Sequence, residues 1–407
     1  MKKTIGFWIM GFLVWQQATG LGALSLQELR LPKDFSPSLS PHATVRSVRE
    51  DPAYPGFLTF EVTSPHGDYS VQGLEDLRQC LREIDVIEKL NAQAEGTGDG
   101  IVAGAGDSLK ETGRGAKNLV THPVDSVAGI GKGIGKIGGK IGGSFRQKEE
   151  GEKGDTYLSG AKRELAKQLG VDVYSRNPYL QAKLDAMAKA RLGGRGLVII
   201  AQLLIPVGLI ASVALTVSGI NGAADQVVND NDRSDLYKLN EKALIQSGFT
   251  EEKAVALLNH PYYTPRELTY LRFYFEKFKG VPGNRALMDA AIAVPSGVPA
   301  QKLLHEMRIA ADSMSGPAKV TGLQRVEEGI VLEKDSAAVL IVGYDHLDAT
   351  GIGKKVADRA AALRAASGKK TTGVWAAGNT TTDFSNLMMT QGISSRRMCL
   401  FDQAQAL

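Results

Sequence analysis

The segment AAVLIVGYDHLD, residues 337–348, joins six apolar residues to a polar loop. A short uncharged run that ends at a turn residue is typical of a buried strand. Beyond it the pattern alternates between helix and strand, which predicts a small α/β unit over residues 319–407. After the first strand we expect a helix at 354–366, a strand at 373–376, a helix at 383–391 and a strand at 398–401.

The loop that follows this strand carries candidate catalytic residues. Asp345, His346 and Asp348 come directly after the apolar run, and α/β sheets hold their ligands at the carboxyl ends of strands. These side chains could act as acid and base or contribute metal ligands, so residues 344–348 would be the site of a hydrolase-like enzyme. Residues of these types also cap helices and hold loops together, and both interpretations stay open.

The middle of the chain, residues 156–318, is expected to be a helical body. Apolar residues recur at helical spacing in residues 158–169, 178–191 and much of 236–313. Between them, residues 197–220 carry no charge and are numerous enough to span a bilayer. We expect one long apolar helix there, which crosses a membrane, lies buried in the core, inserts shallowly into a membrane or breaks into a helical hairpin near Pro206.

The N-terminal part, residues 24–95, is predicted to be a small α+β unit. Residues 57–62 and 69–71 have extended patterns and flank the turn-forming residues 64–68, which indicates a hairpin. From Leu74 to about Ala94, apolar residues recur every three or four positions along a helix. The whole chain is therefore expected to be α+β and predominantly α-helical.

Residues 1–23 have the layout of a secretory signal peptide. Lys2 and Lys3 precede a short apolar run, and small residues follow up to Ala23, where we expect cleavage. The protein is then exported, to the periplasm or in association with a membrane of the bacterial envelope. The two cysteines, Cys80 and Cys399, could form a disulfide there or remain free thiols.

A glycine-rich amphipathic segment and a charged linker occupy residues 96–155. Within it, residues 129–143 read GIGKGIGKIGGKIGG, and on a helix the isoleucines would face away from the lysines. Each interior glycine costs a helix roughly 1 kcal/mol relative to alanine, so the helix needs a lipid surface or a partner helix to form. A flexible linker is the remaining interpretation. The candidate lipid-binding residues are Ile130, Lys132, Ile134, Lys136, Ile137, Lys140, Ile141 and Phe145.

Other ligands have less support in the sequence. Asp230, Asp232, Ser234 and Glu241 match ligand positions of a calcium loop, but Asp235 stands where the loop needs glycine. The alternative is a solvated linker that ends with Ser234 as a helix cap. A formal net charge of only +4 favours no nucleic-acid partner, and no pattern indicates a cofactor.

Four phrases resemble a family of exported bacterial proteins of unknown function: residues 69–73, 119–125, 169–178 and 267–283. The resemblance implies a shared architecture and assigns no active site. The Gly-Ile-Gly-Lys opening at 129–132 also resembles magainin-like peptides, and residues 121–145 resemble the glycine-rich tails of bridge-like lipid-transfer proteins.

These observations together favour an exported envelope protein with a non-enzymatic role that is membrane-associated, lipid-handling or structural. Its expected partners are a membrane surface or lipid, or a protein that packs through a helix. The alternatives are the hydrolase-like enzyme and a secreted membrane-active protein.

Overall fold

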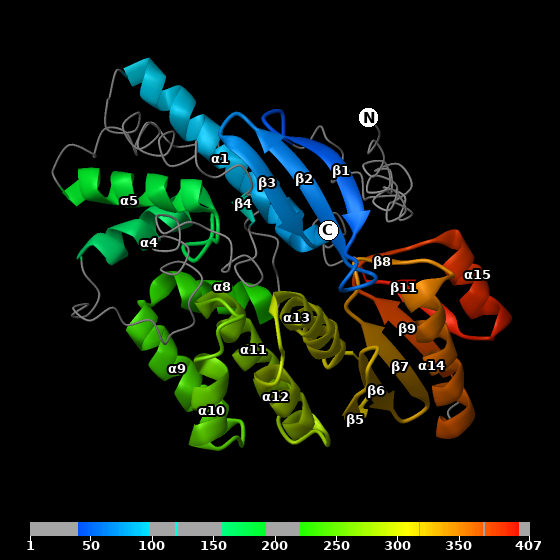
Figure 1. The fold of residues 1–407 in the computed structure, drawn as a ribbon. Coiled ribbons are helices and arrows are strands. Elements are labelled where there is room, and N and C mark those ends of the chain that lie inside the picture. Colours follow the sequence, from blue (N-terminus) through cyan, green and yellow to red (C-terminus); the bar gives the residue numbers. More distant parts are fainter. Residues whose placement is uncertain are drawn as a thin grey trace, which may run out of the picture.

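The computed structural model describes residues 40–97, 119–120, 157–192, 220–316, 318–368 and 371–398. These residues form a mixed α+β structure with eleven helices and three sheets. Figure 1 shows an N-terminal sheet beside a group of helices and a second sheet formed by the C-terminal part. The predicted class, α+β with helix predominant, is confirmed.

The N-terminal sheet has the strand order β1-β2-β3-β4. Leu58, Phe60 and Val62 alternate with more exposed residues along the second strand, so one face is apolar and packs against α1. The predicted hairpin and helix are confirmed, whereas the first strand was missed because only Val48 of its seven residues is buried. The elements are β1 (Thr44–Glu50), β2 (Leu58–Ser64), β3 (Gly67–Gln72), α1 (Leu74–Thr97) and β4 (Leu119–Val120).

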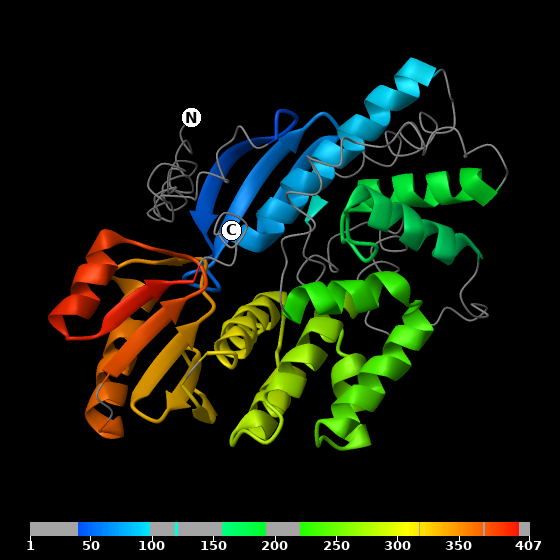
Figure 2. The same ribbon diagram turned by 180° about the vertical axis from the view of Figure 1, so that it is seen from behind.

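The helical body lies to one side of the two large sheets, and Figure 2 shows the same arrangement from behind. Several of its helices begin at polar caps. Thr264 and Glu267 form a reciprocal capping box at the start of α11, with Pro265 as the first helical residue. The buried face of that helix includes Leu271, Tyr274 and Phe275. The helices are α4 (Tyr157–Leu169), α5 (Pro178–Leu192), α8 (Ile220–Asp230), α9 (Arg233–Gln246), α10 (Glu251–Leu258), α11 (Pro265–Lys277), α12 (Asn284–Ile292) and α13 (Gly297–Ser313).

The prediction of one long apolar helix over residues 197–220 is not supported. Residues 197–219 lie outside the described residues. Ile220 begins α8, which has only eleven residues and includes the polar Asn221, Asp225 and Asn229. Within the described ranges, no helix combines the length and apolar character that crossing a bilayer requires.

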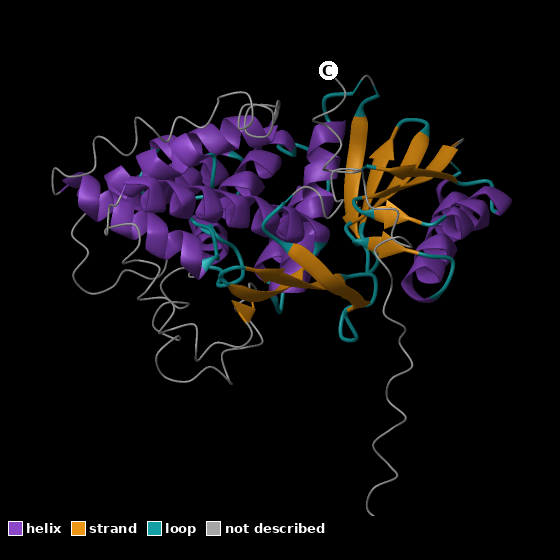
Figure 3. Ribbon diagram, turned by 90° about the horizontal axis from the view of Figure 1, so that it is seen from above, coloured by secondary structure: helices purple, strands orange, loops and turns teal. Residues whose placement is uncertain are grey.

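The C-terminal sheet has the order β11-β9-β7-β6-β5, parallel between β7, β9 and β11 and antiparallel between β5, β6 and β7. Val339 and Ile341 point to the core beneath α13, while Leu340 and Val342 belong to a second core beneath α14 and α15. Figure 3 separates this layered part from the helical part. The elements are β5 (Val320–Arg325), β6 (Ile330–Lys334), β7 (Ala337–Val342), β8 (His346–Leu347), α14 (Gly351–Ser367), β9 (Thr371–Ala376), β10 (Asn379–Thr380), α15 (Thr382–Thr390) and β11 (Ser394–Arg397).

The predicted strand and helix alternation is present in β7, α14, β9 and α15. A last strand was predicted at residues 398–401, whereas the last described strand, β11, covers Ser394–Arg397 and pairs with β9. Met398 follows the strand, and residues 399–407 lie outside the described residues. The four residues of β11 include no apolar side chain, so backbone pairing rather than apolar burial defines this strand.

Candidate functional site

Asp345, the first of the predicted catalytic residues, joins the C-terminal part to the N-terminal part. Its side chain is buried, Oδ2 accepts a hydrogen bond from the Leu58 amide at 3.0 Å, and Oδ1 accepts one from the Leu74 amide at 3.2 Å. The amides of Asp345 and His346 both donate to the Gly56 carbonyl. Burial raises the pKa of Asp345 to about 6. Both carboxylate oxygens are therefore used at the beginnings of β2 and α1.

His346 and Asp348 also have local partners. His346 Nδ1 lies 3.4 Å from Asn379 Nδ2, where β8 pairs with β10, and burial lowers the pKa of the imidazole. Asp348 accepts from the Thr350 amide at 2.9 Å and from its hydroxyl at 2.6 Å, which closes the turn before α14. These contacts favour structural roles for the residues that the sequence singled out.

The predicted calcium residues lie at the junction of α8 and α9. Asp230 pairs with Lys167 at 3.0 Å, and Asp232 accepts from the Asp235 amide at 2.8 Å. Asp232 is therefore the N-cap of α9, and the prediction of Ser234 in that role was wrong. Neither these residues with Glu241 nor any other three His, Cys, Asp or Glu side chains gather into a metal site in the described part of the chain.

The remaining candidates can be placed only in part. All eight candidate lipid-binding residues, Ile130 to Phe145, lie outside the described residues. Cys80 is a buried free thiol on α1, and Cys399 also lies outside them.

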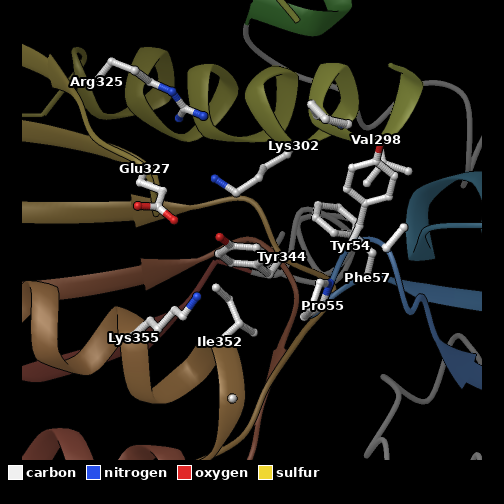
Figure 4. A pocket seen from close by; sticks show the side chains of 13 residues that line it. Tyr54, Pro55, Phe57, Val298, Lys302, Arg325, Glu327, Tyr344, Ile352 and Lys355 are labelled. Carbon is white, nitrogen blue, oxygen red and sulfur yellow. The ribbon is translucent and has the colours of Figure 1, made fainter. Parts of the chain in front are cut away.

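A pocket of about 470 Å³ lies beside the predicted loop, where three distant parts of the sequence meet. Figure 4 shows the side chains that surround it. The loop between β1 and β2 contributes one wall, the first turns of α13 a second, and Tyr344 with the first turn of α14 a third. The lining residues are Ala53, Tyr54, Pro55, Phe57, Val298, Pro299, Lys302, Arg325, Glu327, Tyr344, Gly351, Ile352 and Lys355.

Aromatic rings form the apolar part of the pocket. The Tyr344 ring is 5.6 Å from the Phe57 ring, centroid to centroid, and Lys302 Nζ lies 4.7 Å from the centroid of the Tyr344 ring. Gly56 makes this packing possible: its φ is +87°, and a Cβ there would lie 2.8 Å from the Tyr344 ring. Tyr54 donates or accepts a 2.6 Å hydrogen bond with the Ser296 hydroxyl, which ties the N-terminal loop to α13.

A buried ionic cluster supports the wall formed by α13. Glu306 is fully buried and receives hydrogen bonds from Lys302, Arg325 and, at 3.1 Å, the Gly343 amide. Lys302 Nζ also donates to the Glu328 carbonyl at 2.8 Å. Burial lowers the pKa of Lys302. The lysine is held in place by three neighbours, including the Tyr344 ring, and its charge is largely balanced.

The rim of the pocket has charges that are not balanced in this way. Lys355 and Glu327 are exposed, and neither has an ion pair or side-chain hydrogen bond within the described ranges. Gly351 and Ile352 place the first turn of α14 at the same rim, and the Thr350 side chain does not cap that helix. The N-terminal end of α14 and Lys355 contribute positive potential to this edge, and Glu327 contributes a negative charge.

Sequence reasoning found the strand-end loop but missed the pocket beside it. The available signal was the pair of Lys302 and Glu306, which are four residues apart on the largely buried helix α13, because buried charges are normally paired. Comparisons of the chain with protein-family models, curated proteins and solved structures found no match. The assignment of the candidate site therefore depends on the contacts within this structure.

Proposed function

We propose that the protein is an exported, non-enzymatic protein of the bacterial envelope that binds a small molecule in the pocket beside Tyr344. The pocket, about 470 Å³ in volume, is the observation that carries this proposal. Small-molecule sites have volumes of roughly 300 to 1,000 Å³ and combine an apolar lining with a few polar groups. The aromatic wall and the charged rim agree with that description.

The contacts of the strand-end loop support a binding role over a hydrolase-like one. A general acid or base must reach the substrate atom whose proton it transfers. Both oxygens of Asp345 already accept backbone hydrogen bonds, and Asp348 holds the turn at Thr350. Such carboxylates would have to leave their partners to take part in a reaction.

The proposed location and partners rest on the sequence. Residues 1–23 have the pattern of a secretory signal, and the stripe from Ile130 to Phe145 would suit a lipid surface. A lipid-handling role combines these features with a pocket that accepts apolar compounds. The secreted membrane-active alternative rests on the glycine-rich stripe together with the uncharged residues 197–220.

The neutral fluorescent dye N-phenyl-1-naphthylamine tests the proposed binding role in equilibrium titrations of the purified full chain. We expect its fluorescence to rise on binding. Ile352→Trp, which places a large side chain in the pocket, should weaken binding about tenfold, whereas Ile245→Trp on the exposed face of α9 should not. Equal binding of the dye by both variants would contradict the proposed role.

A further inference from the structure

The charged groups around the pocket do not balance. The cationic side chains that surround the pocket or support its wall are Lys302, Arg325, Lys355 and Arg359. The carboxylates near them are Glu306, Glu327 and Glu328. Glu306 is shared by Lys302 and Arg325, and Glu328 pairs with Arg359 at 2.8 Å. Lys355 and Glu327 remain at the rim. The cluster as a whole therefore has one positive charge in surplus.

Of the four cationic side chains, only Lys355 has no ion pair in the described part of the chain. Lys355 lies in α14 one helical turn after Gly351 and Ile352, which also line the pocket. In Figure 4 Lys355 and Lys302 reach toward the Tyr344 ring from opposite helices. Lys302 is buried and paired with Glu306, so Lys355 is the lysine that can neutralise an incoming group. A negative group seated there would meet both an ammonium and the positive end of a helix.

The other side of the pocket suits an apolar body. Tyr54, Phe57 and Tyr344 present rings, and Val298, Pro299 and Ile352 complete the apolar lining. Aromatic side chains bury large areas and favour flat or extended apolar partners. A ligand with one anionic group and an apolar body would use both halves of the site.

We infer that the ligand of this pocket is a small organic monoanion, with its charged group beside Lys355 and its apolar body against Tyr344 and Phe57. The inference rests on the proposed binding role and adds the ligand class. Both a free aromatic acid and an acyl-chain acid released from a lipid have this chemistry.

The charge requirement is tested with two dyes of similar shape. 1-Anilinonaphthalene-8-sulfonate carries a sulfonate on the ring system that neutral N-phenyl-1-naphthylamine lacks. We expect the sulfonate dye to bind the full-length protein about fivefold to tenfold more tightly, because each opposite charge near a surface contributes on the order of 1 kcal/mol. Raising the salt concentration should reduce the difference.

The adjacent lysines of α14 provide matched variants. Lys355 lines the pocket, while Lys354 does not and pairs instead with Asp358 at 2.9 Å. Lys355→Glu should weaken binding of the sulfonate dye at least fivefold and leave the neutral dye unchanged, whereas Lys354→Glu should change either by less than about twofold. Glu327→Gln should strengthen binding of the sulfonate dye. Far-ultraviolet circular dichroism checks that each variant is folded.

Competition distinguishes the two sources of the anion. Displacement of the sulfonate dye by 1-naphthoate alone would assign an aromatic acid, and displacement by laurate alone would assign an acyl chain; either supports the inference. Failure of both to displace it would overturn the inference.

Two other outcomes separate the inference from the proposed role. Equal affinity for the two dyes, or equal effects of Lys354→Glu and Lys355→Glu, would overturn the ligand class while binding itself stands. If neither of the two dyes binds, the proposed role is overturned together with the inference.

Discussion

Glu83 is a buried carboxyl group that connects α1 to the segment before α5. Gln79 Nε2 donates to it at 2.8 Å, and Ser175 and Asn177 are also hydrogen-bonding partners. Burial nonetheless dominates and raises the pKa from the ordinary 4.5 to about 7. The folded protein therefore binds more protons at Glu83 than the unfolded chain between these two pH values.

The free energy of unfolding should consequently fall as the pH rises from 4.5 to 7. The change corresponds to about 3 kcal/mol, and it is complete above pH 7. Glu83→Gln should remove most of the slope, while Asp345, with a pKa of about 6, still contributes below pH 6. Urea unfolding at pH 5, 6, 7 and 8 measures this, with Glu251→Gln on the exposed face of α10 as the control. Parallel curves for wild type and Glu83→Gln would contradict the assignment.

Asp345→Asn tests the structural role of the strand-end carboxylate. Asparagine has one acceptor oxygen, so one of the Leu58 and Leu74 amides would lose its partner inside the core. We expect a loss of about 2 to 3 kcal/mol in the free energy of unfolding. Asp348→Asn, at a more exposed turn, should cost less than half of that. Equal, small losses from urea titrations of the two variants would refute the role.

At the scale of the element, helix α11 begins with a complete capping box. Thr264 Oγ1 accepts from the Glu267 amide at 3.2 Å, and Glu267 Oε2 accepts from the Thr264 amide at 2.6 Å. Thr264→Ala should reduce the free energy of unfolding by about 1 to 2 kcal/mol. Thr350→Ala at α14 is the matched control, because that threonine makes no capping bond and should cost about half as much or less. The reverse order of the two losses in thermal unfolding would contradict the capping argument.

Periodicity within one element explains which parts of the fold could be predicted. Helix α1 and strand β7 each carry their own apolar pattern, so their existence was readable from adjacent residues. Strands β1 and β5 each bury at most two side chains, and β11 buries none fully. Such strands are stabilised mainly by pairing with their neighbours, and that information is not present in their own sequences.

At the scale of the whole molecule, Gly283 joins the helical body to the C-terminal sheet. Its φ is +91°, and a Cβ there would lie 1.7 Å from the Leu323 carbonyl oxygen. The neighbouring Pro282 carbonyl accepts a 2.9 Å hydrogen bond from the Leu323 amide. Strand β5 therefore lies directly against the turn before α12, with no room for a side chain.

Gly283→Ala should push strand β5 away from the turn before α12. It should lower the free energy of unfolding by several kcal/mol, as expected for a strained backbone combined with overpacking. Gly280→Ala is the matched control: its φ is +78°, and no atom lies within 4 Å of the added Cβ. It should cost only about 1 kcal/mol. Thermal unfolding compares the two, and equal shifts in Tm would show that the close approach contributes nothing.

The candidate site also belongs to this largest scale, which is why only part of it could be predicted. Asp345 was recognised from its position after β7, but its partners Leu58 and Leu74 are more than 270 residues away in the sequence. The pocket likewise combines Tyr54, Lys302 and Lys355, which have no local pattern in common. Their proximity follows from the packing of β2, α13 and α14 around Tyr344.

The most direct test of the central claim is a crystal structure of the full chain grown with 1-anilinonaphthalene-8-sulfonate. We expect the dye in the pocket, with its rings against Tyr344 and its sulfonate within about 3.5 Å of Lys355 Nζ. Dye bound at other surfaces, with only water between Tyr54, Tyr344 and Lys355, would contradict the claim that this pocket is a ligand site.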